Sequence, residues 1–138
     1  MDVSSFILFL LCPMRENIDS YKQLRVFKES FNLALEIFQR TKSFPAEEKY
    51  SLTDQIRRSS RSVCLNLGEA WRKRRYPKSF ISKLSDSEAE ACETQISLLF
   101  ANECGYMSAE IAAAFEKRYE NVIGMIVNMI NNPDQWKI

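Results

Sequence analysis

Histidine is absent from this chain of 138 residues. Without it there is no Ser-His or Cys-His pair for nucleophilic catalysis, and no Glu-x-x-His ligand set for a di-iron bundle. The phosphate-binding patterns G-x-x-x-x-G-K-[ST] and G-x-G-x-x-G are also missing. We therefore expect no enzymatic activity, no catalytic residue and no cofactor.

Glycine and proline are scarce, with three and four copies. A β-rich fold of this length needs many more turn residues, so the composition favours long helices. The length is that of one domain, and the apolar (46%) and charged (27%) fractions are ordinary for a globular protein.

Cysteine occurs four times, at Cys12, Cys64, Cys92 and Cys104, and never as a C-x-x-C pair. A zinc site would have to collect all four thiols from scattered positions, so we predict no metal site. We instead expect buried free thiols, which indicate a reducing compartment and a cytoplasmic protein.

Long hydrophobic runs are missing as well. Phe6–Leu11 contains six apolar residues, whereas a membrane helix needs about 20. No basic residue precedes this run, as a signal peptide would require. We interpret residues 1–20 as a weakly structured extension, with Met14 a plausible true start, and 21–138 as the folded domain. A membrane anchor is the less favoured alternative.

Apolar spacing predicts four helices in the remaining chain. They cover about 21–41, 51–75, 78–104 and 108–131, with Ser51 and Asp54 as a capping box and Gly105 as a stop after the third helix. The expected core residues are Leu24, Phe27, Phe31, Leu35 and Phe38; Leu52, Ile56, Ser59, Val63, Leu67 and Ala70; Phe80, Leu84, Ser87, Ala91, Thr94, Leu98 and Ala101; Ile111, Phe115, Tyr119, Val122, Ile126 and Met129. Short connections between such helices predict an all-α, antiparallel up-down-up-down four-helix bundle.

Several apolar residues fall outside these four stripes. A monomeric bundle would not need them, so we expect a second face that packs against other subunits. These residues are Val26, Leu33, Ile37, Leu65, Leu99, Ile123 and Ile130.

Positive charge is concentrated in Leu52–Lys78, which has eight Lys or Arg and two acidic residues, a net charge of +6 against +1 for the whole chain. Its densest part is Arg72, Lys73, Arg74 and Arg75. One or two cations would suffice to stabilise the helix end through its dipole. Four of them, flanked by Trp71 and Tyr76, predict phosphate contacts with base stacking, and hence nucleic-acid binding.

A polar line follows the second helix, formed by Gln55, Arg58, Asn66 and Glu69. Three interpretations remain open for it: a structural polar seam within or between subunits, which we favour, a solvated face, and a ligand or catalytic site. Nearby serines and Gly68 would let another backbone approach closely, and a mid-helix glycine usually has such a packing reason.

This segment resembles the small four-helix-bundle proteins encoded within intervening sequences of bacterial 23S ribosomal RNA genes, also called S23-type ribosomal proteins. The matching residues are Phe44-Pro45, Glu48, Tyr50-Ser51-Leu52, Gln55-Ile56-Arg57-Arg58, Ser62-Val63, Asn66 and Glu69. The resemblance covers about Tyr21 to Trp136. Two departures are Gly68 and Ala70, where the family usually has Ala and Gly, and a net charge near zero.

The resemblance implies a ring-shaped homo-oligomer, a homopentamer, without enzymatic activity. It also extends to accessory proteins of diversity-generating retroelements, which bind nucleic acid and a reverse transcriptase. Two hypotheses follow: an oligomeric protein that binds ribosomal RNA or other nucleic acid through Arg72–Arg75, or a scaffold for a protein such as a reverse transcriptase. Neither involves a membrane.

Overall fold

The computed structural model describes residues 18–138, which contain helices and turns and no strand. Predictions for Phe6–Leu11, Cys12 and Met14 lie outside these residues. The long helices are α2 (Arg25–Thr41), α3 (Leu52–Arg72), α4 (Pro77–Glu103) and α5 (Ala109–Asn131), and the single 3-10 turns are η1 (Tyr21–Gln23), η2 (Ala46–Glu48) and η3 (Pro133–Gln135). The predicted all-α class with four long helices is confirmed.

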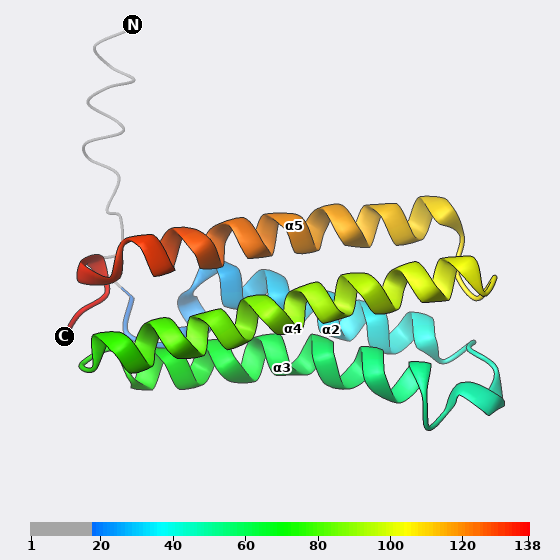
Figure 1. Cartoon of the computed structure of the whole chain (residues 1–138), viewed down its shortest axis with the longest axis horizontal. Helices are drawn as coiled ribbons and strands as arrows, with labels where there is room; N and C mark the ends of the chain where they lie inside the picture. Colours follow the sequence, from blue (N-terminus) through cyan, green and yellow to red (C-terminus); the bar gives the residue numbers. More distant parts are fainter. Residues whose placement is uncertain (1–17) are drawn as a thin grey trace, which may run out of the picture.

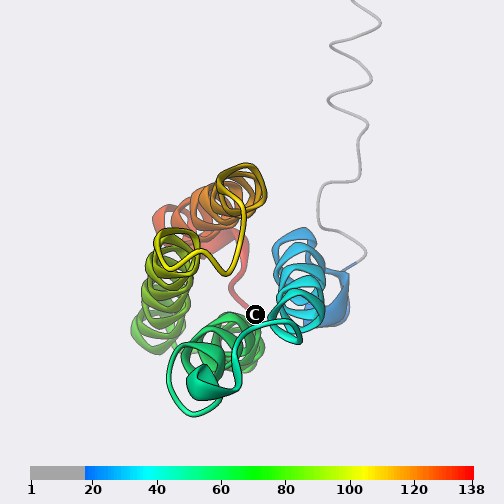
Figure 2. The same ribbon diagram turned by 90° about the vertical axis from the view of Figure 1, so that its right-hand side faces the viewer.

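The four helices lie side by side along one long axis (Figure 1). Followed by colour from blue to red, α2 and α4 progress from left to right, and α3 and α5 return from right to left. Each helix packs against two neighbours, since α3 contacts α2 and α4, and α5 contacts α4 and α2. Seen end-on, α2 and α4 therefore occupy opposite corners of the bundle (Figure 2).

Local signals set the start of α5 and the end of α4. Ser108 caps α5 by accepting a hydrogen bond from the Ile111 N–H at 3.2 Å. Gly105 follows α4 with a φ of 78°, a conformation that favours glycine. The predicted capping box of α3 is wrong: the Ser51 hydroxyl donates to the Glu48 carboxylate instead, and Asp54 pairs with Arg58 at 2.9 Å.

The predicted core residues of α3, α4 and α5 are buried, except that Ile111 is only half-buried. The α3–α4 contact is unusually polar for a core, because hydroxyls stand where the two helices meet. Thr94 donates to the Ser59 hydroxyl at 2.8 Å, and Ser87 donates to the Val63 carbonyl at 2.8 Å. Small side chains with satisfied hydroxyls allow two helices to approach closely.

The prediction for α2 is largely wrong. Of its expected stripe only Leu24 is buried, whereas Phe31 and Leu35 are exposed and Phe27 and Phe38 half-buried. The residues that α2 does bury are Val26, Ser30, Leu33, Ala34, Ile37 and Thr41. Three of these, Val26, Leu33 and Ile37, therefore pack in the core and not on the intersubunit face that the sequence predicts.

Polar contacts join α2 to α5 and α3 in the observed rotation. The Arg118 guanidinium on α5 binds Glu29 at 3.1 Å and Glu36 at 2.6 Å, both on α2. On the α3 side, Arg57 Nε donates to the Thr41 hydroxyl at 2.8 Å. Turning the aromatic stripe of α2 into the core would break all three contacts.

Candidate nucleic-acid interface

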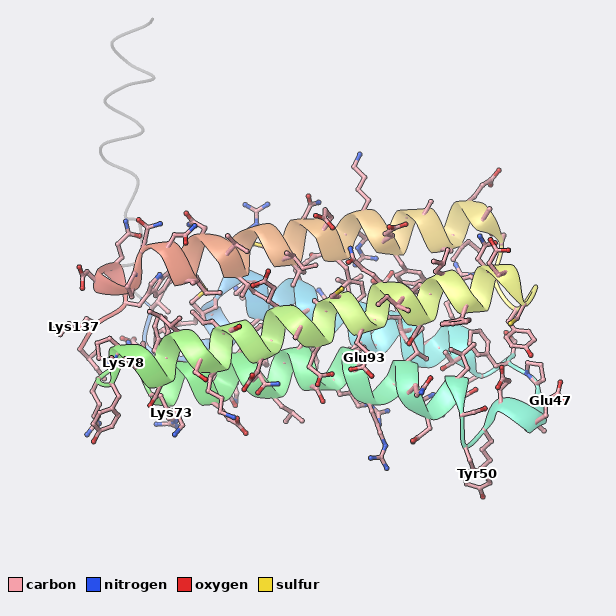
Figure 3. All side chains as sticks on the ribbon, in the orientation of Figure 1. Glu47, Tyr50, Lys73, Lys78, Glu93 and Lys137 are labelled. Atoms are coloured by element: carbon pink, nitrogen blue, oxygen red, sulfur yellow. The ribbon has the colours of Figure 1, made fainter. Side chains whose placement is uncertain are left out.

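The basic run lies where α3 ends and turns into α4. Arg72 is the last residue of α3, Lys73 caps its C-terminus, and Pro77 opens α4. The cations therefore spread over a turn rather than around a helix. In Figure 3 the labelled Lys73 and Lys78 lie at one end of the bundle together with Lys137, and Glu47 and Tyr50 lie at the other end.

Arg74 differs from its neighbours because it packs against the protein. Its guanidinium carbon lies 3.4 Å from the centre of the Trp71 ring, and its Nε donates to the Trp71 carbonyl at 2.8 Å. Burial, and secondarily the charge of Arg72, lowers the pKa of Arg74. Arg74 is thus a structural cation that covers a tryptophan.

The expectation that Trp71 stacks on an unpaired base is wrong, because its side chain is only 5% exposed and lies beneath Arg74. Tyr76 remains a candidate, with 60% of its surface exposed. A base could therefore stack at this turn on Tyr76 and not on Trp71.

Arg72, Lys73 and Arg75 remain exposed. Lys78 joins them from the first turn of α4 and is exposed too. None of the four takes part in an ion pair within residues 18–138. The turn therefore presents four cations whose charge no carboxylate in the described chain neutralises.

A small pocket of about 240 Å³ adjoins this turn, lined by Lys73, Lys78, Ser79, Ser82 and Lys83. Tyr76 supplies no side-chain cap to α4, and after Pro77 the amide hydrogens of Lys78 and Ser79 have no intrahelical acceptor. Amide hydrogens at a helix N-terminus, together with lysines, favour anions such as phosphate. Sequence reasoning counted Lys78 only as a charge and missed the two serines, although Pro77 at a helix start was a usable signal.

Lys83 is the cation of this pocket that already has partners. It binds Glu69 at 3.0 Å and Asp86 at 3.7 Å. The hydrogen bond and charge of Glu69 raise the pKa of Lys83. Glu69 thus links α3 to α4 at the border of the basic turn.

Two other residues of the polar seam, Arg58 and Asn66, form their side-chain contacts within α3. Arg58 pairs with Asp54 on its own helix and is 79% exposed, and Asn66 Nδ2 donates to the Ser62 carbonyl at 2.9 Å. Gln55 is exposed. Within residues 18–138 no hydrogen bond or ion pair joins one seam residue to another. Inside one chain the structure therefore resembles a solvated face more than a connected seam.

An apolar groove with a volume of about 940 Å³ lies between α2 and α3. Its walls are Tyr21, Phe27, Phe31, Ala34, Leu35, Phe38, Arg61, Cys64, Leu65, Gly68, Glu69, Arg72 and Lys73. Phe27 stacks on Phe31 with ring centres 5.9 Å apart, so the aromatic row is ordered along the groove. The groove ends at Arg72 and Lys73, beside the basic turn.

Cysteine chemistry offers no second site. Cys64 is buried and free, as expected, but Cys92 and Cys104 are exposed, which corrects the prediction of buried thiols. Within the described residues 18–138, no three cysteine or acidic side chains gather as metal ligands. In the same part of the chain, no helix combines the length and apolar character needed to cross a bilayer.

Comparison with known proteins identifies the relatives. A family model described as 23S rRNA-intervening sequence protein matches residues 22–128. The chain belongs to this family. The match covers α2, α3 and α4 entirely and most of α5, so family membership rests on the bundle itself.

A crystal structure points to the same group. It is that of a protein with unknown function from the S23 ribosomal protein family of Bacteroides thetaiotaomicron, which superposes with a TM-score of 0.70 at 25% identity. The alignment covers 77% of this chain and 95% of that one. No curated protein matches the chain. The resemblance drawn from Phe44-Pro45 and the following motif is confirmed.

Proposed function

We propose that this member of the 23S rRNA-intervening sequence protein family is a non-enzymatic, cytoplasmic homo-oligomer that binds nucleic acid. The contacts come from Arg72, Lys73 and Arg75, with Lys78 beside them. The observation that supports this most is the exposure of these four cations without any ion pair among residues 18–138. An uncompensated cluster of this kind is the usual footprint of a phosphate backbone.

Ribosomal RNA is the proposed ligand, because the family is named for intervening sequences of 23S rRNA. Unpaired bases in such RNA could stack on the exposed Tyr76. In a ring of antiparallel bundles, homopentameric as the family resemblance implies, the basic turn would recur around the assembly. Several weak contacts with one RNA molecule would then combine into tight binding through avidity.

The test uses fluorescence anisotropy with a labelled single-stranded RNA, at several salt concentrations. The variant carries Arg72→Ala, Lys73→Ala and Arg75→Ala, and leaves Arg74 on Trp71. We expect binding to weaken at least tenfold. The slope of log Kobs against log salt should fall by about 2, because each lost phosphate contact on a single strand removes about 0.7.

A matched control removes the same charge elsewhere, through Arg40→Ala, Arg58→Ala and Lys117→Ala, three exposed positions outside the basic turn. Its binding and salt slope should stay close to those of the native chain. Equal losses in both triple variants would show that net charge rather than this turn attracts RNA. Unchanged binding in the first variant would contradict the proposal.

A second candidate function is a protein-interaction scaffold without nucleic-acid affinity, for instance an adaptor of a reverse transcriptase. The apolar groove between α2 and α3 favours this alternative, because exposed aromatic walls are typical of protein contacts. It predicts no RNA binding at physiological salt. It also predicts a stoichiometric complex when the purified chain is mixed with such an enzyme.

A further inference from the structure

Two apolar surfaces lie on opposite sides of this bundle. The first is the α2–α3 groove described above, whose exposed walls range from 48% exposure at Phe31 to 64% at Leu65. Exposed aromatic and leucine side chains in one contiguous groove are unusual for a monomer. α2 forms one wall of this groove, and α2 and α4 occupy opposite corners of the bundle (Figure 2), so the outer face of α4 lies away from that wall.

The second surface is the outer stripe of α4, which we define as Ala89, Cys92, Ile96, Leu99 and Phe100. All five are exposed, and the three large ones range from 51% exposure at Ile96 to 59% at Phe100. Ala89, Cys92, Ile96 and Leu99 follow one another at steps of three or four, and Phe100 is four residues after Ile96, which places all five on one helix face. The opposite face of α4 is the core stripe, so this helix is apolar on both sides.

The two surfaces agree in length. The groove runs along α2 from Phe27 to Phe38, and the stripe runs along α4 from Ala89 to Phe100. At 1.5 Å per helical residue, each spans about 16 Å. The outer stripe of α4 is therefore long enough to contact the groove along its whole length.

The two surfaces are also opposite in charge. Arg61, Arg72 and Lys73 border the groove, and its one acidic residue, Glu69, is already paired with Lys83. The stretch of α4 from Leu84 to Glu103 contains five acidic residues and no basic one. Glu88, Glu93 and Glu103 lie on or beside the stripe face of α4, so this face would gain from a cationic partner.

We propose that the α2–α3 groove binds the outer stripe of α4 from a second copy of this chain. The inference rests on the proposed homo-oligomer and assigns its contact surfaces. Because groove and stripe are different surfaces, the contact is heterologous and repeats from copy to copy, which generates a ring when the rotation closes. The basic turn then borders each subunit contact, since Arg72 and Lys73 form one end of the groove.

Gly68 agrees with this contact. It lines the groove, and a Cβ added there would meet no atom within 4 Å. Among residues 18–138, no close approach therefore accounts for a glycine in the middle of α3. A helix from a neighbouring copy supplies the close approach that the sequence predicted.

The test is a mixing experiment with the full chain. One variant carries Phe31→Asp and Leu35→Asp in the groove, and the other carries Ile96→Asp and Leu99→Asp in the stripe. We expect the native chain to sediment as an oligomer and each variant alone as a monomer with native helix content by circular dichroism. Mixed in equal amounts, the two should form a 1:1 dimer and nothing larger, because one native groove and one native stripe remain.

Dimer formation on mixing also proves that both variants are folded. Tyr50→Asp is the control, since Tyr50 is exposed and belongs to neither surface; this variant should assemble as the native chain does. A native chain that stays monomeric would overturn the proposal. An oligomer that survives either double substitution, or variants that stay monomeric when mixed, would overturn it too.

RNA binding and sedimentation are both measured on every variant, including the Arg72, Lys73 and Arg75 triple variant, because Arg72 and Lys73 line the groove as well as the basic turn. None of the four substituted positions is a cation of the basic turn. If assembly persists in the variants while the Arg72, Lys73 and Arg75 triple variant loses RNA binding, the contact surfaces are wrong and RNA binding stands. If assembly fails as expected while the triple variant still binds RNA, the contact surfaces stand and the proposed RNA contacts are wrong.

Discussion

Cys64 shows how one buried residue of α3 responds to its surroundings. Its thiol is enclosed between α2 and α3, and its Sγ lies 4.0 Å from the Ser60 carbonyl as a weak hydrogen-bond donor. Burial raises the pKa of the Cys64 thiol from 9.0 to about 11. The charged thiolate is disfavoured there because the groove wall offers it little water.

A pH-dependent stability follows from this raised pKa. Below pH 9 the thiol is protonated in both folded and unfolded chains, so its contribution to stability is fully present. Between pH 9 and about 11 only the unfolded thiol ionises, so the free energy of unfolding should fall by about 1.4 kcal/mol per pH unit from this residue. Urea unfolding at pH 8 and pH 11 measures the difference.

Matched variants isolate the contribution of Cys64. In Cys64→Ala this part of the decline should disappear, whatever the variant's stability at neutral pH. Cys92→Ala, at an exposed position on α4, should keep the native decline. If the free energy of unfolding falls with pH as steeply in Cys64→Ala as in the native chain, Cys64 is not the cause of this part of the decline.

Within the basic run, the sequence did not distinguish the role of one cation from that of another. The four consecutive cations predicted one uniform patch, but the structure separates Arg74, which stacks on Trp71, from Arg72, Lys73 and Arg75. A one-dimensional pattern cannot make this distinction, because the position where α3 ends decides which side chain folds back on the ring.

At the scale of whole helices, Arg118 joins α5 to α2. Its guanidinium binds Glu29 and Glu36, two carboxylates seven positions apart on one face of α2. The hydrogen bond to Glu36 is the main reason that the pKa of Arg118 is raised. A three-member network holds its geometry better than an isolated surface pair.

Arg118→Ala should lower the free energy of unfolding by about 1 kcal/mol at low salt, because two partly exposed ion pairs are lost. The loss should shrink at 0.5 M salt, where screening weakens both pairs. Lys117→Ala on the same helix is the control, since Lys117 has no ion pair within residues 18–138, and alanine and lysine have similar helix propensities. Urea unfolding at both salt concentrations provides the measurement. Equal effects of the two substitutions would argue against the network.

For the molecule as a whole, Gly68 connects folding to assembly. Gly68 and Gly124 both lie inside long helices, and a Cβ at either would meet nothing within 4 Å. Replacing a mid-helix glycine by alanine stabilises a chain by about 1 kcal/mol. Both substitutions should therefore raise the free energy of unfolding of the dilute chain.

Only Gly68→Ala should weaken self-association, because only Gly68 lines the α2–α3 groove. Sedimentation over a dilution series should show its oligomer dissociating at higher concentration than that of the native chain. Gly124→Ala should dissociate as the native chain does. If Gly68→Ala leaves the dissociation unchanged, the neighbouring copy does not pack at this glycine.

The sequence by itself determined the four helices, their approximate ends, the core faces of α3, α4 and α5, and the family. On each of these three helices the predicted stripe is also the buried one, so local spacing sufficed. The motif that begins at Phe44-Pro45 was specific enough to identify relatives without any coordinates. The sequence did not determine the capping of α3, because Glu48 and Asp54 each lie three positions from Ser51. In the structure the Ser51 hydroxyl donates to Glu48.

Only the tertiary structure decided which side of α2 faces the core. Its sequence carries two apolar stripes, one with Phe31 and Leu35 and one with Leu33 and Ile37, and helical periodicity permits either. Turning α2 to bury the aromatic stripe would remove Glu29 and Glu36 from Arg118. The observed rotation of this helix therefore shows itself in contacts with residues that are distant in sequence. The same rotation exposes the groove on which the proposed assembly depends.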